Sequence, residues 1–279
     1  MTQRVTLLAD DFYFLEAPKY RDGLIYTSDA HDGKVYTVTP DGASRKLVQL
    51  TSNPAGLGFL GDGRLIIAAT TDRKLMQIKD GVLSVYADLS AVAAGPLNDF
   101  VIDAQDRIFV GNYGYDFHGG AAPRPADMHR VDPDGSVHVV AQNVHFANGM
   151  AIINHGRTLV VNETWVGRVI AYDLSADGIL SGRRLFADLA GKGPDGMYAD
   201  AEGALWIGCY FSGEVLRVKD GGEITDSFKF DCAGISCCLG GEDGKTLYMT
   251  AFISRPEDVQ ARQLRGSRIY MARVEVGAA

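Results

Sequence analysis

The sequence predicts an all-β protein, and within that class a six-bladed β-propeller. Six segments share one pattern of opening turn, β-rich run, polar turn and second β-rich run. Their opening turns recur about 40 to 49 residues apart, a period typical of four-stranded propeller blades. The runs are rich in β-branched and aromatic residues and are punctuated by 33 glycines, whereas the 3.6-residue period of an amphipathic helix is almost absent.

Each blade is expected to begin near a turn of the Asp-Gly type. These turns lie at 22–23, 62–63, 106–107, 155–156, 202–203 and 243–244. Six blades use nearly the whole chain, so we expect one domain over residues 1–279. A strand near 4–8 should lie beside the run 269–276 and close the last blade, which removes unpaired sheet edges. The alternative is a β-sandwich of short strands, which would not require six repeats in register.

Composition limits the classes of partner. A net charge of −8 argues against nucleic acid or an anionic membrane and leaves a small molecule as the expected ligand. No stretch has the pattern of a signal peptide or a membrane span, so we expect a cytoplasmic protein, a monomer or weak dimer by default. The four cysteines lack the spacing of a zinc site or a disulfide framework, and we expect buried, reduced thiols: Cys209, Cys232, Cys237 and Cys238.

One position of the repeat carries an oxygen-bearing side chain in four of six copies. Asn98, Asn148 and Asp195 occupy it, and Glu16 stands one residue out of register. We call this position the slot; the other two copies have Ala55 and Ser236 there. In a propeller the slot begins the innermost strand of each blade, so its side chains should face the axis. Two carboxylates and two carboxamides, without His or Cys, favour Ca²⁺, with Mg²⁺, Mn²⁺ or Zn²⁺ as alternatives. A single Asn or Asp would more simply cap a turn.

Four short motifs surround these positions in a fixed order. They are Glu16-Ala17-Pro18, Asn98-Asp99, Asn148-Gly149-Met150 and Pro194-Asp195-Gly196-Met197, followed by Ser236-Cys237, Gly240-Gly241 and Thr246-Leu247-Tyr248. Together they resemble the SMP-30/gluconolactonase/luciferin-regenerating-enzyme family of six-bladed propellers, over almost the whole chain. The resemblance implies a divalent-metal lactonase or related esterase. It implies Glu16, Asn148 and Asp195 as metal ligands and Asn98 as a ligand or substrate contact.

The chain departs from the family pattern at three places. Sugar-lactone members usually have Arg two residues before the Asn of the Asn-Asp motif, where this chain has Pro96. An acidic substrate contact expected after the next strand is replaced within 111–118, and the Gly of the first motif is replaced by Ala17. These departures leave the metal chemistry intact but do not favour an aldonolactone substrate.

Lactone hydrolysis needs a polarised carbonyl, an attacking water and a base. A cation polarises the carbonyl, but Ca²⁺ activates water weakly, so a carboxylate base is still required. We assign that role to Asp195, since carboxamides do not titrate. Ser236 could be a nucleophile, but no His is paired with it in the sequence, and a small hydroxyl lining the channel is the preferred interpretation.

The loop from Asn112 to Asp127 interrupts blade three and is the longest departure from the repeat. Loops on rigid scaffolds often carry specificity, although this one could be an ordinary surface insertion. Candidate substrate contacts are Tyr113, Asp116, Phe117, His118, His145 and Phe146, with Trp165, Tyr210, Phe211 and Phe252 at expected rim positions. These aromatics favour an aromatic or aliphatic lactone, or an activated ester. A phosphotriesterase, a strictosidine-synthase-like condensing enzyme and a non-catalytic propeller with a structural calcium remain alternatives.

Overall fold

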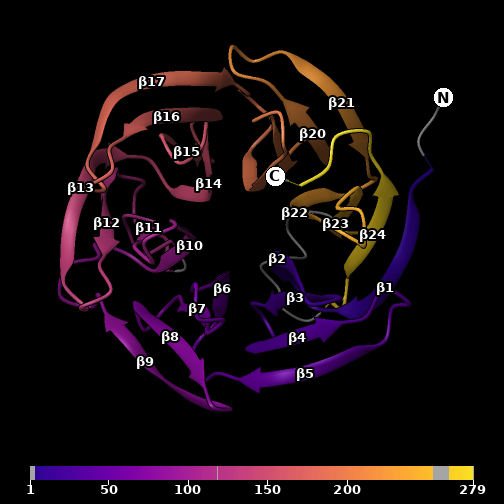
Figure 1. The fold of residues 1–279 in the computed structure, drawn as a ribbon, viewed down its shortest axis with the longest axis horizontal. Helices are drawn as coiled ribbons and strands as arrows, with labels where there is room; N and C mark the ends of the chain where they lie inside the picture. The colour runs from indigo at the N-terminus through magenta and orange to yellow at the C-terminus, as the bar shows by residue number, and fades with distance from the viewer. Residues whose placement is uncertain (1–3, 118, 254–263, 279) are drawn as a thin grey trace.

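Six antiparallel sheets surround one axis. The computed structural model describes residues 4–117, 119–253 and 264–278. Within these residues every sheet has four strands, and the sheets are arranged as the blades of a propeller (Figure 1). Over the same part of the chain there is no α-helix, and hence none long and apolar enough to cross a membrane. The predicted all-β class and six-bladed propeller are confirmed.

Five blades are built from consecutive strands, which run outwards from the axis in chain order. Blades one to three contain β2 (Leu15–Arg21), β3 (Leu24–Asp29), β4 (Lys34–Val38) and β5 (Ser44–Gln49); β6 (Pro54–Phe59), β7 (Leu65–Ala69), β8 (Lys74–Lys79) and β9 (Val82–Asp88); and β10 (Leu97–Ile102), β11 (Ile108–Asn112), β12 (Ala126–Val131) and β13 (Val137–Val144). Blades four and five contain β14 (Ala147–Ile153), β15 (Thr158–Glu163), β16 (Arg168–Leu174) and β17 (Leu180–Asp188); and β18 (Pro194–Ala199), β19 (Leu205–Cys209), β20 (Glu214–Val218) and β21 (Ile224–Lys229).

The sixth blade joins the two ends of the described chain. Its order is β22 (Ala233–Gly240), β23 (Thr246–Phe252), β24 (Ser267–Arg273) and β1 (Thr6–Phe12), so the N-terminal strand forms the outer edge of the last sheet. β1 pairs antiparallel with β24, from Thr6 opposite Met271 to Phe12 opposite Ser267. The predicted closure by the two terminal segments is therefore confirmed. It leaves the ring without a gap between the first and last blades.

Local turn chemistry explains the tight hairpins. Arg21 pairs with Leu24, so only Asp22 and Gly23 connect β2 to β3. Both have positive φ, 50° and 79°, as a two-residue hairpin turn with the twist of its strands requires. Gly suits such a turn, and Asp is among the residues that tolerate it.

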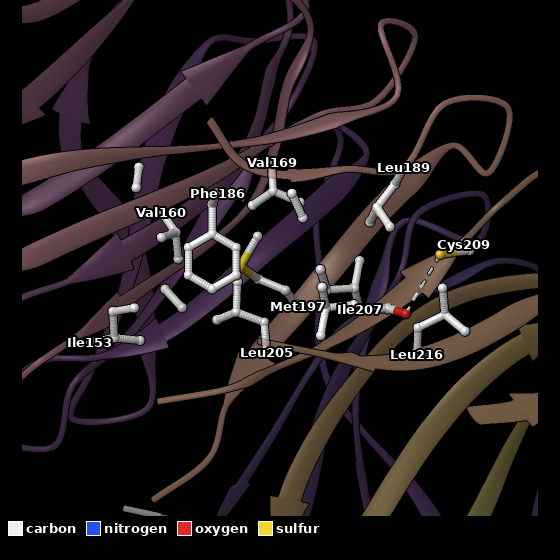
Figure 2. Packing of buried hydrophobic residues seen from close by; sticks show 14 residues of the cluster. Ile153, Val160, Val169, Phe186, Leu189, Met197, Leu205, Ile207, Cys209 and Leu216 are labelled. Atoms are coloured by element: carbon white, nitrogen blue, oxygen red, sulfur yellow. Dashed lines mark hydrogen bonds between the residues drawn. The ribbon is translucent and has the colours of Figure 1, made fainter. Parts of the chain in front are cut away.

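The hydrophobic core lies between neighbouring blades. Each strand nearest the axis contacts the corresponding strand of the next blade, so β2, β6, β10, β14, β18 and β22 form a closed inner ring. Figure 2 shows the packing between blades four and five, where Val160 and Phe186 meet Met197, Leu205 and Ile207. All five are buried. This packing fixes the spacing of the inner strands and therefore the positions of the slot residues.

The four cysteines are unpaired, as the sequence predicted. Cys209, Cys237 and Cys238 are buried, whereas Cys232 is half-buried. Burial raises the pKa of the Cys209 and Cys238 thiols to about 12 and that of Cys232 to about 11. Since the thiolate is the reactive form, these cysteines are inert near neutral pH.

Candidate functional site

Every innermost strand has a pairing irregularity near its first residues. The register shifts lie between Glu16 and Lys19, Pro54 and Leu57, Leu97 and Phe100, Ala147 and Met150, Pro194 and Met197, and Gly234 and Ser236. A β-bulge bends its strand and re-aims a side chain. Glu16, Asn98, Asn148 and Asp195 all lie at such an irregularity. The recurring oxygen-bearing position therefore coincides with a recurring backbone feature.

Strand pairing corrects the expected offset of Glu16. Leu15 in β2 and Pro194 in β18 each pair with the last residue of the following strand. Glu16 and Asp195 come directly after them, so the two carboxylates occupy equivalent positions. The one-residue offset was wrong because it was counted from the opening turn. The Asp22-Gly23 turn is shorter than the corresponding connection in blade five.

The bulge beside Glu16 explains why the family pattern has glycine where this chain has Ala17. Ala17 has a φ of 45°, in the left-handed region that favours glycine, and it is buried. Glycine would adopt this conformation without strain, so Ala17 holds strain next to a candidate ligand.

Side-chain hydrogen bonds connect the slot residues of blades three, four and five. Asn98 Nδ2 donates to the Ala147 carbonyl at 3.0 Å. Asn148 Nδ2 donates to Asp195 Oδ1 at 2.6 Å and to Thr164 Oγ1 at 3.1 Å. Both amino groups are therefore engaged by the protein. Asn148 Oδ1, in contrast, is buried and has no hydrogen-bond partner among the residues that the structure describes.

Two polar residues at this site were missed from the sequence. Asp99 is buried, and its Oδ1 also lacks a partner within the described chain. Asn162, fully buried on β15, donates from Nδ2 to the Asp195 carbonyl at 2.6 Å and so supports the bulge that carries Asp195. Asp99 belongs to the Asn98-Asp99 motif, and Asn162 interrupts an apolar strand. Both signals are visible in the sequence, but neither one places its residue at the axis.

Three carboxylates perturb one another across the axis. The pKa of Glu16 is raised well above its usual range, first by loss of hydration and then by repulsion from Asp195 and Asp99. The pKa of Asp195 is raised by burial and by Asp99, against the opposing hydrogen bond from Asn148. Burial also raises the pKa of Asp99. Poorly hydrated negative charge of this kind is stabilised by a bound cation.

The chemistry of these groups fits a hard divalent cation. The candidate donors are all oxygens, and at least one carboxamide oxygen is buried without a partner. No group of three His, Cys, Asp or Glu side chains is gathered as a metal cluster in the described residues. A cation here would therefore depend on the carboxamides of Asn98 and Asn148 as well as on Glu16 and Asp195.

Strand pairing also corrects the expected register of Ser236. Ala233 pairs with Phe252, the last residue of β23, so Gly234 and not Ser236 occupies the slot of blade six. Ser236 is buried against blade five. A Cβ added at Gly196 would lie 2.0 Å from Ser236 Oγ, so glycine permits this contact. The Ser236 amide donates to Thr250 Oγ1 at 3.1 Å. That Ser236 is a small hydroxyl lining the channel, and not a nucleophile, stays a prediction.

The long loop of blade three spans 113–125, between β11 and β12. Tyr113 stacks on Phe146 with ring centroids 4.3 Å apart, so the structure brings these two candidates together. Asp116 is exposed, and its Oδ1 accepts a hydrogen bond from the Gly119 amide within the loop. His118 lies outside the described residues.

His145 and Phe146 precede β14 and are positioned by a buried acid. The His145 amide donates to Glu163 Oε1 at 2.8 Å, and Phe146 has a φ of 50°. Glu163 is fully buried and ion-paired with Arg168 and Arg183. His145 itself is half-buried. Phe252, expected at the rim, is buried, and its ring packs 6.1 Å from that of Phe14.

Comparison with known proteins identifies the family of this chain. The family model described as the SMP-30/Gluconolactonase/LRE-like region matches residues 16–253. Regucalcin of Xenopus laevis is 30% identical over 277 residues, covering 95% of this chain and 92% of its own length. Lactonase drp35 of Staphylococcus aureus (strain MRSA252) is 28% identical over 210 residues, covering 70% of this chain and 63% of its own length.

A solved structure shows the same fold. The protein described as a calcium-binding protein, regucalcin, from Agrobacterium tumefaciens superposes with a TM-score of 0.83 at 20% identity, covering 99% of this chain and 96% of that one. The family match spans all four candidate ligands, from Glu16 to Asp195. This chain therefore belongs to the SMP-30/Gluconolactonase/LRE-like family.

Proposed function

We propose that the protein is a divalent-metal-dependent hydrolase that opens a small lactone. The observation that carries the proposal is the convergence of Glu16, Asn98, Asn148 and Asp195 at equivalent bulges of four inner strands. Unsatisfied oxygens and mutually repelling carboxylates at this point favour a cation. A relative named a lactonase and a related structure described as calcium-binding support the two halves of the proposal.

Glu16, Asn148 and Asp195 would hold the cation, with Asn98 as a further ligand or substrate contact. Ca²⁺ fits best because its large, flexible shell accepts oxygen ligands from separate blades. When bound, the cation would act as a Lewis acid on the lactone carbonyl. The hydrogen bond from Asn148 Nδ2 to Asp195 Oδ1 fixes the orientation of the Asp195 carboxylate.

Asp195 would act as the general base. Its carboxylate takes a proton from water as the water oxygen bonds to the carbonyl carbon. The ring C–O bond then breaks, and the leaving alkoxide receives that proton to give an open hydroxy acid. The pKa of Asp195 is raised by burial and by Asp99, which makes its carboxylate a stronger base than an exposed aspartate.

A structural calcium site is the second candidate, and the hydrogen bonds favour it independently. The bonds from Asn98 to Ala147 and from Asn148 to Asp195 join neighbouring blades. A cation held there could stabilise the ring without taking part in a reaction. A phosphotriesterase would use the same cation on a phosphoryl oxygen and is distinguished by its substrate.

The test is hydrolysis measured with a pH indicator after chelation and re-addition of Ca²⁺, Mg²⁺, Mn²⁺ or Zn²⁺. Substrates are gluconolactone, γ-butyrolactone, dihydrocoumarin, an aryl ester and a phosphotriester. Asp195→Asn keeps the shape of the side chain but removes the base, whereas Asp80→Asn changes an exposed carboxylate in the turn between β8 and β9 and serves as the control.

Metal-dependent lactone turnover that is lost in Asp195→Asn and kept in Asp80→Asn would support the proposal. Turnover of the phosphotriester alone would assign the same site to a different reaction. Calcium-dependent stabilisation without turnover of any substrate would overturn the hydrolase and leave the structural role.

A further inference from the structure

Aromatic side chains form a continuous arc over blades three, four and five. The arc, here called the aromatic rim, consists of Tyr113, Tyr115, Phe117, Phe146, Trp165 and Phe211. Phe146 lies 4.3 Å from Tyr113 and 5.1 Å from Trp165 between ring centroids. Trp165 lies 5.3 Å from Phe211, so the rings form an unbroken series across the three blades.

In blades three and four the aromatic rim is connected to the slot by a hydrogen bond and by short stretches of chain. The Tyr113 amide donates to the Pro96 carbonyl at 2.9 Å, and Pro96 stands two residues before Asn98. Phe146 stands two residues before Asn148. Tyr113 and Phe146 are therefore each anchored at a position two residues before a slot residue.

Trp165 and Phe211 complete this relation in blades four and five. Trp165 follows Thr164, whose Oγ1 accepts the hydrogen bond from Asn148. Phe211 covers Gly193, two residues before Asp195, and a Cβ at Gly193 would lie 2.5 Å from the Phe211 ring. The rim therefore borders the candidate site along the three blades that supply Asn98, Asn148 and Asp195.

The ring at the centre of the rim is held in a strained conformation. Phe146 has a φ of 50°, which a bulky side chain rarely adopts. The hydrogen bond from the neighbouring His145 amide to buried Glu163 holds the chain in place. Backbone strain of this kind persists where the surroundings over-determine it, and it clusters at ligand sites.

The outer end of the rim is open to solvent. Trp165 is 38% exposed and Phe211 is 50% exposed, whereas Phe146, in edge contact with Trp165, is buried. Single exposed aromatics are ordinary, but neighbouring ones supported by a buried ring form a platform for another flat group.

Blade two presents the opposite character beside the same inner ring. Ser52 Oγ and Thr71 Oγ1 are hydrogen-bonded at 2.9 Å, and Thr70 Oγ1 is buried without a partner among the described residues. The slot of this blade has Ala55, which offers no ligand atom. The surroundings of the site are therefore aromatic over blades three to five and polar over blade two.

We infer that the aromatic rim selects lactones that carry an aromatic ring, with that ring stacked on Trp165 and Phe211 and the lactone carbonyl at the slot. The inference rests on the proposed lactonase activity and specifies its substrate class. A polyhydroxylated sugar lactone would lose hydration against these rings, and Pro96 offers it no donor. An aryl-fused lactone would gain stacking and keep its polar ring at the cation.

The test compares catalytic efficiency for dihydrocoumarin, γ-butyrolactone and gluconolactone in the calcium-loaded full-length protein. Trp165→Ala and Phe211→Ala should each lower the ratio of dihydrocoumarin to γ-butyrolactone efficiency by about tenfold, the order expected for one aromatic stack. Trp165→Phe should restore most of that ratio. Leu185→Ala, which removes an equally exposed apolar side chain from the outer strand β17, should leave it unchanged.

A ratio that stays constant in both alanine variants would overturn the inference while leaving the lactonase intact, as would a preference of the wild type for gluconolactone. If the wild type opens no lactone, the proposed lactonase activity is wrong, and a binding measurement then tests whether the aromatic rim is a ligand site. Trp165 is the exposed one of the two tryptophans, so 3-(2-hydroxyphenyl)propanoate should quench its fluorescence. Quenching that is lost in Trp165→Phe and weakened in Phe211→Ala would support an aromatic-ligand site; its absence would overturn it.

Discussion

Gly149 provides a direct test of how closely blades four and five approach at the site. A Cβ at this position would lie 2.4 Å from the Asp195 carbonyl oxygen, 2.6 Å from the Met197 amide nitrogen and 2.9 Å from the Gly196 carbonyl carbon. All three atoms are backbone, so no side chain can rotate away. Since carbon atoms pack at about 3.5 Å or more, Gly149→Ala should move β18 by about 1 Å.

The expected cost follows from this displacement. Overpacking of a well-packed interior usually costs about 1–3 kcal/mol, and we expect the upper end because both strands belong to the inner ring. A protein of this size loses about 2–4 °C in Tm for each kcal/mol, which predicts a fall of about 5–10 °C. A shift of about 1 Å at Asp195 should lower lactone turnover by about 100-fold.

Thermal unfolding followed by circular dichroism, with and without Ca²⁺, measures the first effect, and the pH-indicator assay measures the second. Gly61→Ala is the matched control, because its new Cβ would meet its nearest neighbour, Asp106, at an ordinary 3.4 Å. Neither glycine has a positive φ, so the comparison isolates packing. Wild-type Tm and calcium response in Gly149→Ala would refute the close approach of the two blades.

Four further outcomes are expected. Calcium affinity measured by calorimetry should fall as the pH is lowered through the raised pKa values of Glu16 and Asp195, because protons compete for both carboxylates; an affinity independent of pH would contradict their role. Without metal the same shifts stabilise the protein at low pH, and this contribution is lost as the pH rises through the raised values, so the metal-free Tm should fall on raising the pH. Arg217→Ala should cost about 3–5 kcal/mol in urea unfolding, since it strands buried Asp200, now paired at 2.7 Å; a cost below about 1 kcal/mol would show that water reaches the carboxylate. Ala17→Gly should raise the calorimetric Tm by about 1–2 °C through relief of strain at φ 45°, and a lower Tm would refute that strain.

Turn chemistry and repeat length were enough to predict the blades and the closing strand. The turn at Asp22-Gly23 shows why, because its residues suit the positive φ values that the hairpin imposes. The same turn caused the error at Glu16. The spacing in the sequence includes the residues of the connection between two strands. The position of a residue at the axis depends instead on how the strands pair. A shorter connection therefore shifts the spacing without shifting the position at the axis.

Asp99 marks the second limit of sequence reasoning. Alternation along a regular strand would send Asn98 and Asp99 to opposite faces, so the repeat that places Asn98 at the axis does not predict Asp99 there. The bulge breaks that alternation, and Asp99 raises the pKa of both Glu16 and Asp195. Long-range contacts such as that of Asn162 with the Asp195 carbonyl depend on blade spacing, which no local pattern encodes.

The closure of blade six by β1 has a consequence for the order in which the site forms during synthesis. Glu16 emerges from the ribosome long before Asp195, and its strand β2 contacts β6 of blade two as well as β22 of blade six, which is made last. The sheet of blade six is complete only when β24 is available to pair with β1. A nascent chain that stops before Ser267 would hold all four candidate ligands but lack the pairing of β1 with β24, and its calcium affinity should be lower than that of the closed ring. Calcium uptake by the growing polypeptide would then report the completion of the ring.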